Sequence, residues 1–284
     1  MVHLEHADTA TAIGFLKPKR LRHNRDTLVS ICKERFQIQD LTYWQSIRLL
    51  QSPEILSEEE GEAPKEIWNL ENGTFKKSLL AIMDQDHFQE NWKFSNHEIG
   101  LYSESLKRAL GLFQQLYPEI YEEFAETIHA LLFAKRDSYD GGSVSSRVGM
   151  IWLSPKEHWT DVNWADNLLH EFVHNCLFLE DMVNTIFPYS ASRMAEDDAL
   201  VVSAIRRTKR GYDKSYHAAF VAYALVEFYE KLGRFDKAKS LLIPLFPSLN
   251  DMRQNLTFIS DNGQKHLDDL IGSVLGKSRQ LGLT

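Results

Sequence analysis

The chain contains the pattern HExxH, two histidines four residues apart with a glutamate directly after the first. The residues are His170, Glu171 and His174. Residues four apart lie on one face of an α-helix, so two imidazoles at this spacing can bind one metal ion. In zinc peptidases that carry the pattern, the glutamate is the general base that acts on a metal-bound water. The motif therefore predicts a metal site at the two histidines and a catalytic role for Glu171.

The motif lies in a segment, residues 164–179, whose hydrophobic residues recur at helical spacing. We therefore expect an amphipathic helix, with Asp161 or Asn163 at its N-cap. Upstream, residues 148–153 form a short hydrophobic run between a Gly-Gly-Ser and a Ser-Pro segment, which predicts a strand. A strand beside a metal-binding helix can pair its backbone with an extended peptide. The arrangement predicts a polypeptide substrate.

Two histidines leave a metal ion with too few protein ligands, so a third ligand is expected downstream. Glu196 lies at a distance along the chain that suits the glutamate ligand of a thermolysin-like zinc peptidase. His217 lies further on, in a hydrophobic segment where a buried imidazole needs a partner to offset its desolvation. The residues alone leave both candidates open.

The metal decides which chemistry follows. Two histidines with a third ligand and open positions suit zinc-dependent hydrolysis, but three such ligands also suit non-haem iron that activates oxygen. An oxygenase that uses 2-oxoglutarate needs a cation for the distal carboxylate of this co-substrate, and arginine can bind it through two parallel hydrogen bonds. Arg206 and Arg210, four residues apart, are candidates for this role if one face presents both. A solvated basic turn is the alternative interpretation.

The rest of the chain predicts mainly helices. The expected helical ranges are about 27–56, 98–135 with an interruption at Pro118, a segment through 202–206, 214–233, and two more between 235 and 281. Residues 57–64 are acidic and contain Gly and Pro, which is typical of an exposed loop. We expect an N-terminal helical region over 1–95 and a metal-binding catalytic region over 96–284, or one continuous domain. The fold class is mostly α, an α+β protein with a small sheet beside the HExxH helix.

Composition and charge argue against several classes of function. A formal net charge of −8 is unusual for a nucleic-acid-binding protein. No hydrophobic run approaches the length of about 20 residues that crosses a bilayer, and the first residues lack the pattern of a signal peptide. Cys32 and Cys176 have no CxxC spacing, which is typical of buried thiols in a reducing compartment. We therefore expect a cytoplasmic protein that binds neither membranes nor nucleic acids.

Basic residues cluster near the N-terminus, where they form either a solvated surface or a contact for an acidic partner such as a peptide leader segment. The cluster consists of Lys17, Lys19, Arg20, Arg22 and Arg25.

Residues 140–232 resemble the HExxH peptide-modification proteins that accompany ribosomally made natural products. The similarity lies in Gly142-Ser143, in residues 148–154, in residues 168–174, and in the arginine-rich turn that leads to residues 216–222. The resemblance implies an iron(II)- and 2-oxoglutarate-dependent hydroxylase that modifies the β-carbon of a residue in a precursor peptide. It further implies a fold other than the double-stranded β-helix (cupin) barrel. Two positions depart from the family pattern: Gly211 follows Arg210 where the family has proline, and Ala218 follows the third histidine where it has glycine.

Three hypotheses follow for the function. In the first, His170, His174 and His217 hold iron(II), Arg206 and Arg210 bind 2-oxoglutarate, and the partner is a precursor peptide. In the second, the protein is a zinc peptidase in which Glu196 is the third ligand and Glu171 is the base. In the third, the protein is a non-catalytic binding protein in which the motif is structural. The sequence does not fix the peptide, the modified residue or the oligomeric state.

Overall fold

A computed structural model describes the chain in four stretches, residues 11–51, 64–69, 93–135 and 140–283. Its contacts divide the chain into two compact units. Residues 21–179 form one unit, here called the sheet unit, and residues 1–20 together with 180–284 form the other, here called the helical unit. The expected functional regions, 1–95 and 96–284 or one continuous domain, stay a prediction. The acidic segment at 57–64 lies outside the described residues except for Pro64.

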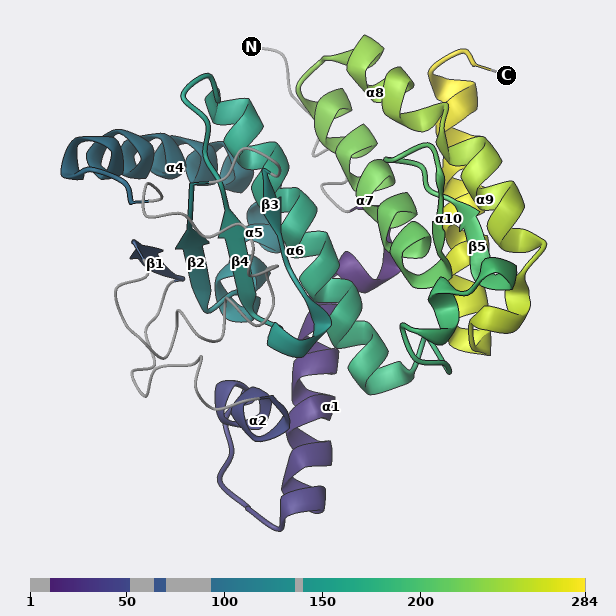
Figure 1. Cartoon of the computed structure of the whole chain (residues 1–284), viewed down its shortest axis with the longest axis horizontal. Coiled ribbons are helices and arrows are strands. Elements are labelled where there is room, and N and C mark those ends of the chain that lie inside the picture. Colours follow the sequence, from purple (N-terminus) through teal and green to yellow (C-terminus); the bar gives the residue numbers. More distant parts are fainter. Residues whose placement is uncertain (1–10, 52–63, 70–92, 136–139, 284) are drawn as a thin grey trace, which may run out of the picture. The chain divides into compact units, whose positions relative to one another are not determined.

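The sheet unit contains a four-stranded mixed sheet (Figure 1). Its strands, in spatial order, are β1 (Lys65–Trp68), β2 (Ala130–Phe133), β4 (Met150–Leu153) and β3 (Gly141–Gly142). The first three run parallel, and β3 pairs antiparallel with β4. The expected strand over 148–153 is therefore confirmed as β4.

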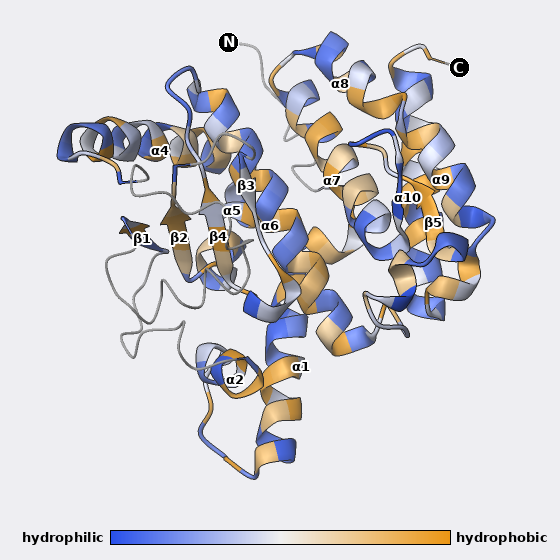
Figure 2. Ribbon diagram, viewed as in Figure 1, coloured by the Kyte–Doolittle hydropathy of each residue, from blue (hydrophilic) through white to orange (hydrophobic). Residues whose placement is uncertain are grey.

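Strand β2 is a correction to the helix expected over 98–135. That range contains helix α4 (Asn96–Leu116), helix α5 (Pro118–Thr127) and then β2. Pro118 opens α5 as expected, because its missing N–H is not needed at the first helical position. All residues of β2 are buried, and Figure 2 shows this strand as hydrophobic along its length. The sequence of a strand that is buried on both faces is a continuous hydrophobic run. Hydrophobic periodicity alone cannot distinguish such a run from a segment of a buried helix.

The N-terminal part of the sheet unit also differs from the expectation, because it contains two separate helices. In place of a continuous helix over 27–56, the chain forms α1 (Pro18–Phe36) and α2 (Tyr43–Leu50). Gln37 ends α1 with a φ of 57°, and Thr42 begins α2 through a capping box with Gln45. A left-handed residue followed by a new N-cap stops one helix and starts another.

Helix α6 (Asp161–Asn184) carries the HExxH motif and packs against α4 and α5. The Phe172 ring lies 5.3 Å from that of Phe124 and 6.3 Å from that of Phe113, measured between centroids. The expected helix over 164–179 is confirmed, and it extends by about a turn at each end. Its hydrophobic residues Leu168, Leu169, Phe172, Val173, Cys176 and Leu177 are all buried.

The helical unit consists of α7 (Tyr212–Lys231), α8 (Phe235–Leu242), α9 (Leu245–Arg253), α10 (Asp261–Gln280) and a hairpin of β5 (Leu200–Val202) and β6 (Lys209–Gly211). The helix expected over 214–233 is confirmed as α7, and Gly233 follows it with a φ of 70°. Three helices, where two were expected, occupy the range 235–281.

The hairpin corrects the helical segment expected through 202–206. Val201 and Val202 lie in β5, and the connecting turn closes through a hydrogen bond from the Ser203 N–H to the Thr208 carbonyl. Arg207 in this turn has a φ of 58°. β-Branched residues favour strands, and a left-handed residue is incompatible with a continuing helix.

Three arginines of the N-terminal basic cluster form ion pairs within their own units. In the helical unit, the Arg20 guanidinium binds the buried carboxylate of Glu180, which also contacts His266 Nε2 at 3.2 Å. In the sheet unit, Arg25 and Arg22 lie 2.7 and 3.2 Å from the carboxylate of Glu123. These arginines therefore stabilise the fold, and Lys17 and Lys19 remain as exposed members of the cluster.

The structure confirms a mostly helical protein with a small mixed sheet. The strands of the described stretches form the four-stranded sheet and the hairpin, an arrangement unlike a double-stranded β-helix. None of the helices among the described residues has the length and hydrophobicity needed to span a membrane.

Candidate metal-binding helix

Helix α6 begins at a reciprocal cap that lies one residue before Asp161 and three before Asn163, the two N-caps expected from the sequence. Thr160 is the N-cap: its Oγ1 accepts the Asn163 N–H at 3.3 Å, and Asn163 Oδ1 accepts the Thr160 N–H at 3.0 Å. Asp161 instead binds Arg108 on α4 at 3.0 Å. This capping box has the amide of asparagine in the place that glutamate or glutamine usually occupies.

The two histidines of the motif lie side by side on a partly exposed stripe of α6. Their ring centroids are 5.1 Å apart. Two imidazoles that share a metal at about 2.1 Å, with a ligand–metal–ligand angle near 100°, have centroids about 5 Å apart. The separation of His170 and His174 is therefore compatible with two ligands of one metal ion.

Glu171, next to His170, is buried, with 4% of its surface exposed. Its Oε2 accepts a hydrogen bond from Ser143 Oγ at 2.8 Å, and its Oε1 lies 3.8 Å from His170 Nε2. Burial raises the pKa of Glu171 from 4.5 to about 8, and the Ser143 hydrogen bond opposes this rise. In the metal-free protein the carboxyl therefore holds a proton in most molecules at pH 7.

Two glycines bring the chain close to this carboxyl. A Cβ at Gly141 would meet Leu153 Cδ2 at 2.8 Å and lie 3.6 Å from Glu171 Oε1. A Cβ at Gly142 would overlap the Trp152 indole at 2.2 Å. Strand β3 can pass between β4 and the motif glutamate because neither residue has a side chain.

Asn175, which the sequence analysis did not identify, connects the motif to the sheet. Its Oδ1 accepts the Gly149 N–H at 2.8 Å, and its Nδ2 donates to the Glu171 carbonyl at 2.9 Å. The residue is fully buried. A polar residue on the hydrophobic face of an amphipathic helix was the available signal. Asn175 fixes the motif turn of α6 against the start of β4.

Strand β4, which we expected to align a peptide, lies between two other strands of the described sheet. β4 pairs with β2 along its whole length and with β3 at Trp152 and Leu153, so much of its backbone is already engaged in the sheet. Among the described strands β3 is the outer one on this side. A peptide that adds to this edge of the sheet meets β3 first.

His217, the candidate third ligand, lies in α7 of the helical unit. Its side chain is 6% exposed, and its ring stacks on Phe187 with centroids 5.9 Å apart and an interplanar angle of 20°. Burial lowers the pKa of His217 from 6.5 to about 3. The imidazole is therefore neutral at physiological pH, which is the form that binds metals.

Glu196, the competing candidate, is on the surface of the same unit. It follows a short 3-10 turn (Arg193–Ala195), its side chain is 62% exposed, and it lies 3.2 Å from Arg193. Nothing buries or orients this carboxylate, since an exposed ion pair holds its side chains only weakly.

Arg206 and Arg210, the candidate 2-oxoglutarate ligands, have different settings. Arg206 is exposed in the turn of the hairpin, and Arg210 is half-buried in β6 opposite Val201. Because this segment is not helical, the argument that a spacing of four puts both on one face does not apply. The position of Arg210 is more restricted than that of Arg206, because Arg210 lies on a paired strand and is half-buried.

The structure thus brings His170, Glu171 and His174 together in the sheet unit, whereas His217, Glu196, Arg206 and Arg210 belong to the helical unit. Within the described stretches, no three His, Cys, Asp or Glu side chains group in a way that could hold a metal. The assignments of a metal site and a co-substrate site stay predictions.

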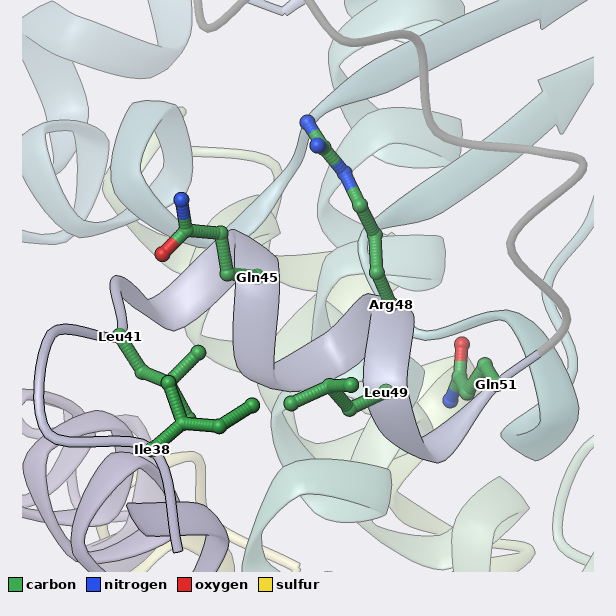
Figure 3. A pocket seen from close by; sticks show the side chains of 6 residues that line it. All are labelled: Ile38, Leu41, Gln45, Arg48, Leu49 and Gln51. Atoms are coloured by element: carbon green, nitrogen blue, oxygen red, sulfur yellow. The ribbon is translucent and has the colours of Figure 1, made fainter. Parts of the chain in front are cut away.

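A hollow of about 450 Å³ lies elsewhere in the sheet unit, beside α2. Figure 3 shows the hydrophobic ends of Ile38, Leu41 and Leu49 gathered in it, with Arg48 pointing away from them. Its lining contains none of the HExxH residues, so we assign it no part in the candidate site.

Comparison with models of known protein families finds no match, and a search of curated proteins finds no relative.

Proposed function

We propose that this protein is an iron(II)- and 2-oxoglutarate-dependent hydroxylase that acts on the β-carbon of a residue in a ribosomally made precursor peptide. The observation that carries the proposal is the pair of imidazoles on α6, whose 5.1 Å centroid separation fits two ligands of one metal. The sequence resemblance supports the choice of iron and of the co-substrate.

His217 is the third ligand in this proposal. Its buried imidazole is neutral, which is the form that binds a metal. A polar ring is costly to bury, so a buried one usually has a hydrogen-bond or metal partner. Glu196, by contrast, is exposed and paired with Arg193. These settings support His217 over Glu196.

Arg210 binds the distal carboxylate of 2-oxoglutarate, and Arg206 contributes at longer range from the hairpin turn. A guanidinium on a paired strand is held in orientation, which favours bidentate binding of a carboxylate. Iron(II) with bound 2-oxoglutarate supplies the oxygen activation, and the residues of the chain hold and orient the reactants.

The peptide adds to the outer edge of β3 in this proposal. This edge lies next to the motif, because Ser143 directly follows β3 and binds Glu171. An extended peptide that pairs with β3 would bring one side chain towards the histidine stripe of α6. Glu171, held by Ser143, orients the ligands or a bound water rather than reacting itself.

A zinc peptidase is the second candidate. The observation that favours it is the position of Glu171, whose Oε1 lies 3.8 Å from His170 Nε2 and whose pKa of about 8 suits a group that exchanges protons near neutral pH. The cation would lower this pKa when bound, which makes the carboxylate available as a base.

Metal affinity of two variants separates these candidates. The hydroxylase proposal expects His217→Ala to lose tight metal binding while Glu196→Gln retains it, and the peptidase expects the reverse. His158→Ala, which removes an exposed histidine just before α6, is the matched control and should bind metal as the wild type does. Retained tight binding in both His217→Ala and Glu196→Gln would rule out both ligand sets.

A further inference from the structure

The first turn of α7 places a carboxylate four residues before His217. This residue is Asp213, and residues four apart lie on the same face of a helix. Asp213 and His217 therefore share one face of α7, within the helical unit. The sequence analysis gave no role to Asp213.

One oxygen of Asp213 lacks a hydrogen-bond partner although it is buried. Oδ1 is shielded from solvent, and no donor among the described residues reaches it. The carboxylate does accept a hydrogen bond from the backbone N–H of Lys214, as an acid in a first helical turn commonly does. Burial raises the pKa of Asp213, and the charges of Lys214 and Arg210 oppose this rise. Buried polar atoms are nearly always paired, so Oδ1 is available to accept a further hydrogen bond.

Gly211 leaves the space that this oxygen occupies. A Cβ at Gly211 would lie 2.9 Å from Asp213 Oδ1 and 2.8 Å from the Met194 carbonyl oxygen. Directly before α7, this chain therefore keeps room for a carboxylate.

We propose that Asp213 is a positioning residue that accepts the ring N–H of His217 when the other ring nitrogen of His217 binds the metal. Histidines that bind metals commonly donate their second ring N–H to a carboxylate, which fixes the tautomer and the orientation of the ring. The inference rests on the proposed function, in which His217 is a ligand. In this inference Asp213 would hold the ring of His217 and would not itself bind the metal.

Titration with cobalt(II) alone, followed by its visible absorption, tests this role without any turnover. Asp213→Ala should weaken cobalt(II) binding by about 10- to 100-fold and change the shape of the absorption bands. Asp213→Asn keeps an oxygen that can accept the N–H, so its loss should be smaller. Gly211→Ala places a methyl group against Asp213 Oδ1, so it should also weaken cobalt(II) binding.

Asp236→Ala is the matched control, because Asp236 is an exposed acid in the first turn of α8 in the same unit. It should bind cobalt(II) as the wild type does. Urea unfolding of the metal-free proteins identifies variants that fail to fold, and Asp213→Asn replaces Asp213→Ala if the latter does.

The outcomes distinguish this inference from the proposed function. Wild-type affinity in folded Asp213→Ala, together with lost binding in His217→Ala, overturns the role of Asp213 and leaves the proposed ligand set intact. Wild-type affinity in His217→Ala overturns the proposed third ligand, and the role of Asp213 with it.

Discussion

Replacement of Glu171 by glutamine should make the metal-free protein more stable at alkaline pH. The folded protein buries this carboxyl, and its pKa rises from 4.5 to about 8. Between these values the folded state binds more protons than the unfolded state, so the contribution of Glu171 to stability is full below about pH 4.5 and is lost as the pH rises through about 8. The glutamine side chain of the variant cannot ionise, and its amide oxygen can still accept the Ser143 hydroxyl.

The size of the effect follows from the difference between the two pKa values. At about 1.4 kcal/mol for each unit of pKa, a rise from 4.5 to about 8 corresponds to at most about 5 kcal/mol above pH 8. Water penetration and relaxation around a buried charge reduce such costs, so we expect a gain of about 2–4 kcal/mol. Near pH 4.5 the wild type and the variant should differ by less than about 1 kcal/mol.

Urea unfolding in the presence of a chelator, at pH 5 and at pH 8.5, measures this difference. Glu126→Gln on α5 is the matched control, because Glu126 is exposed and its replacement should change stability little at either pH. A Glu171→Gln gain that is the same at both pH values would refute the reasoning, since it would show that the carboxyl is not desolvated in the folded protein.

Other substitutions test the contacts that hold the motif. Asn175→Ala leaves the buried Gly149 N–H without its acceptor and should cost about 1–3 kcal/mol in urea unfolding. Gly149→Ala should destabilise the protein measurably in the same assay, because Gly149 has a φ of 87° and a Cβ there would overlap Trp44 at 2.4 Å. Arg20→Ala leaves the buried Glu180 carboxylate without its guanidinium and should cost about 3–5 kcal/mol, visible as a lower thermal midpoint; an unchanged midpoint would show that the His266 contact compensates.

Helices and strands whose own residues favour that structure strongly could be predicted from the sequence. Helix α6 has a continuous hydrophobic face, and α7 ends at Lys231, two residues before the left-handed Gly233. The strand at 150–153 is rich in β-formers and bounded by turn residues. Each of these signals lies within the segment that it describes, so no knowledge of distant contacts is needed.

The wrong expectations come from segments whose structure is decided by the rest of the fold. Residues 130–133 become a strand because β1 and β4 flank them, although their hydrophobic pattern also suits a helix. Residues 200–211 form a hairpin that other elements hold, through the bonds from Asp251 to the Val202 N–H and from Ser215 to the Val201 carbonyl. Local periodicity contains no information about such partners.

The proximity of the two motif histidines was predictable from the sequence, but the surroundings of the candidate site were not. The spacing of His170 and His174 alone places their rings on one face. The settings of Ser143 and Asn175 depend on contacts to residues 28 and 26 positions away along the chain. Such contacts follow from the packing of α6 on the sheet, which the sequence pattern does not specify.

The central claim is that one iron(II) centre binds 2-oxoglutarate in this protein. Anaerobic titration with iron(II) and 2-oxoglutarate tests it most directly, because a visible charge-transfer band appears only when both bind the same centre. The account predicts this band in the wild type and its loss in His217→Ala. Absence of the band, together with tight zinc binding that survives His217→Ala and fails in Glu196→Gln, would contradict the account and support the peptidase.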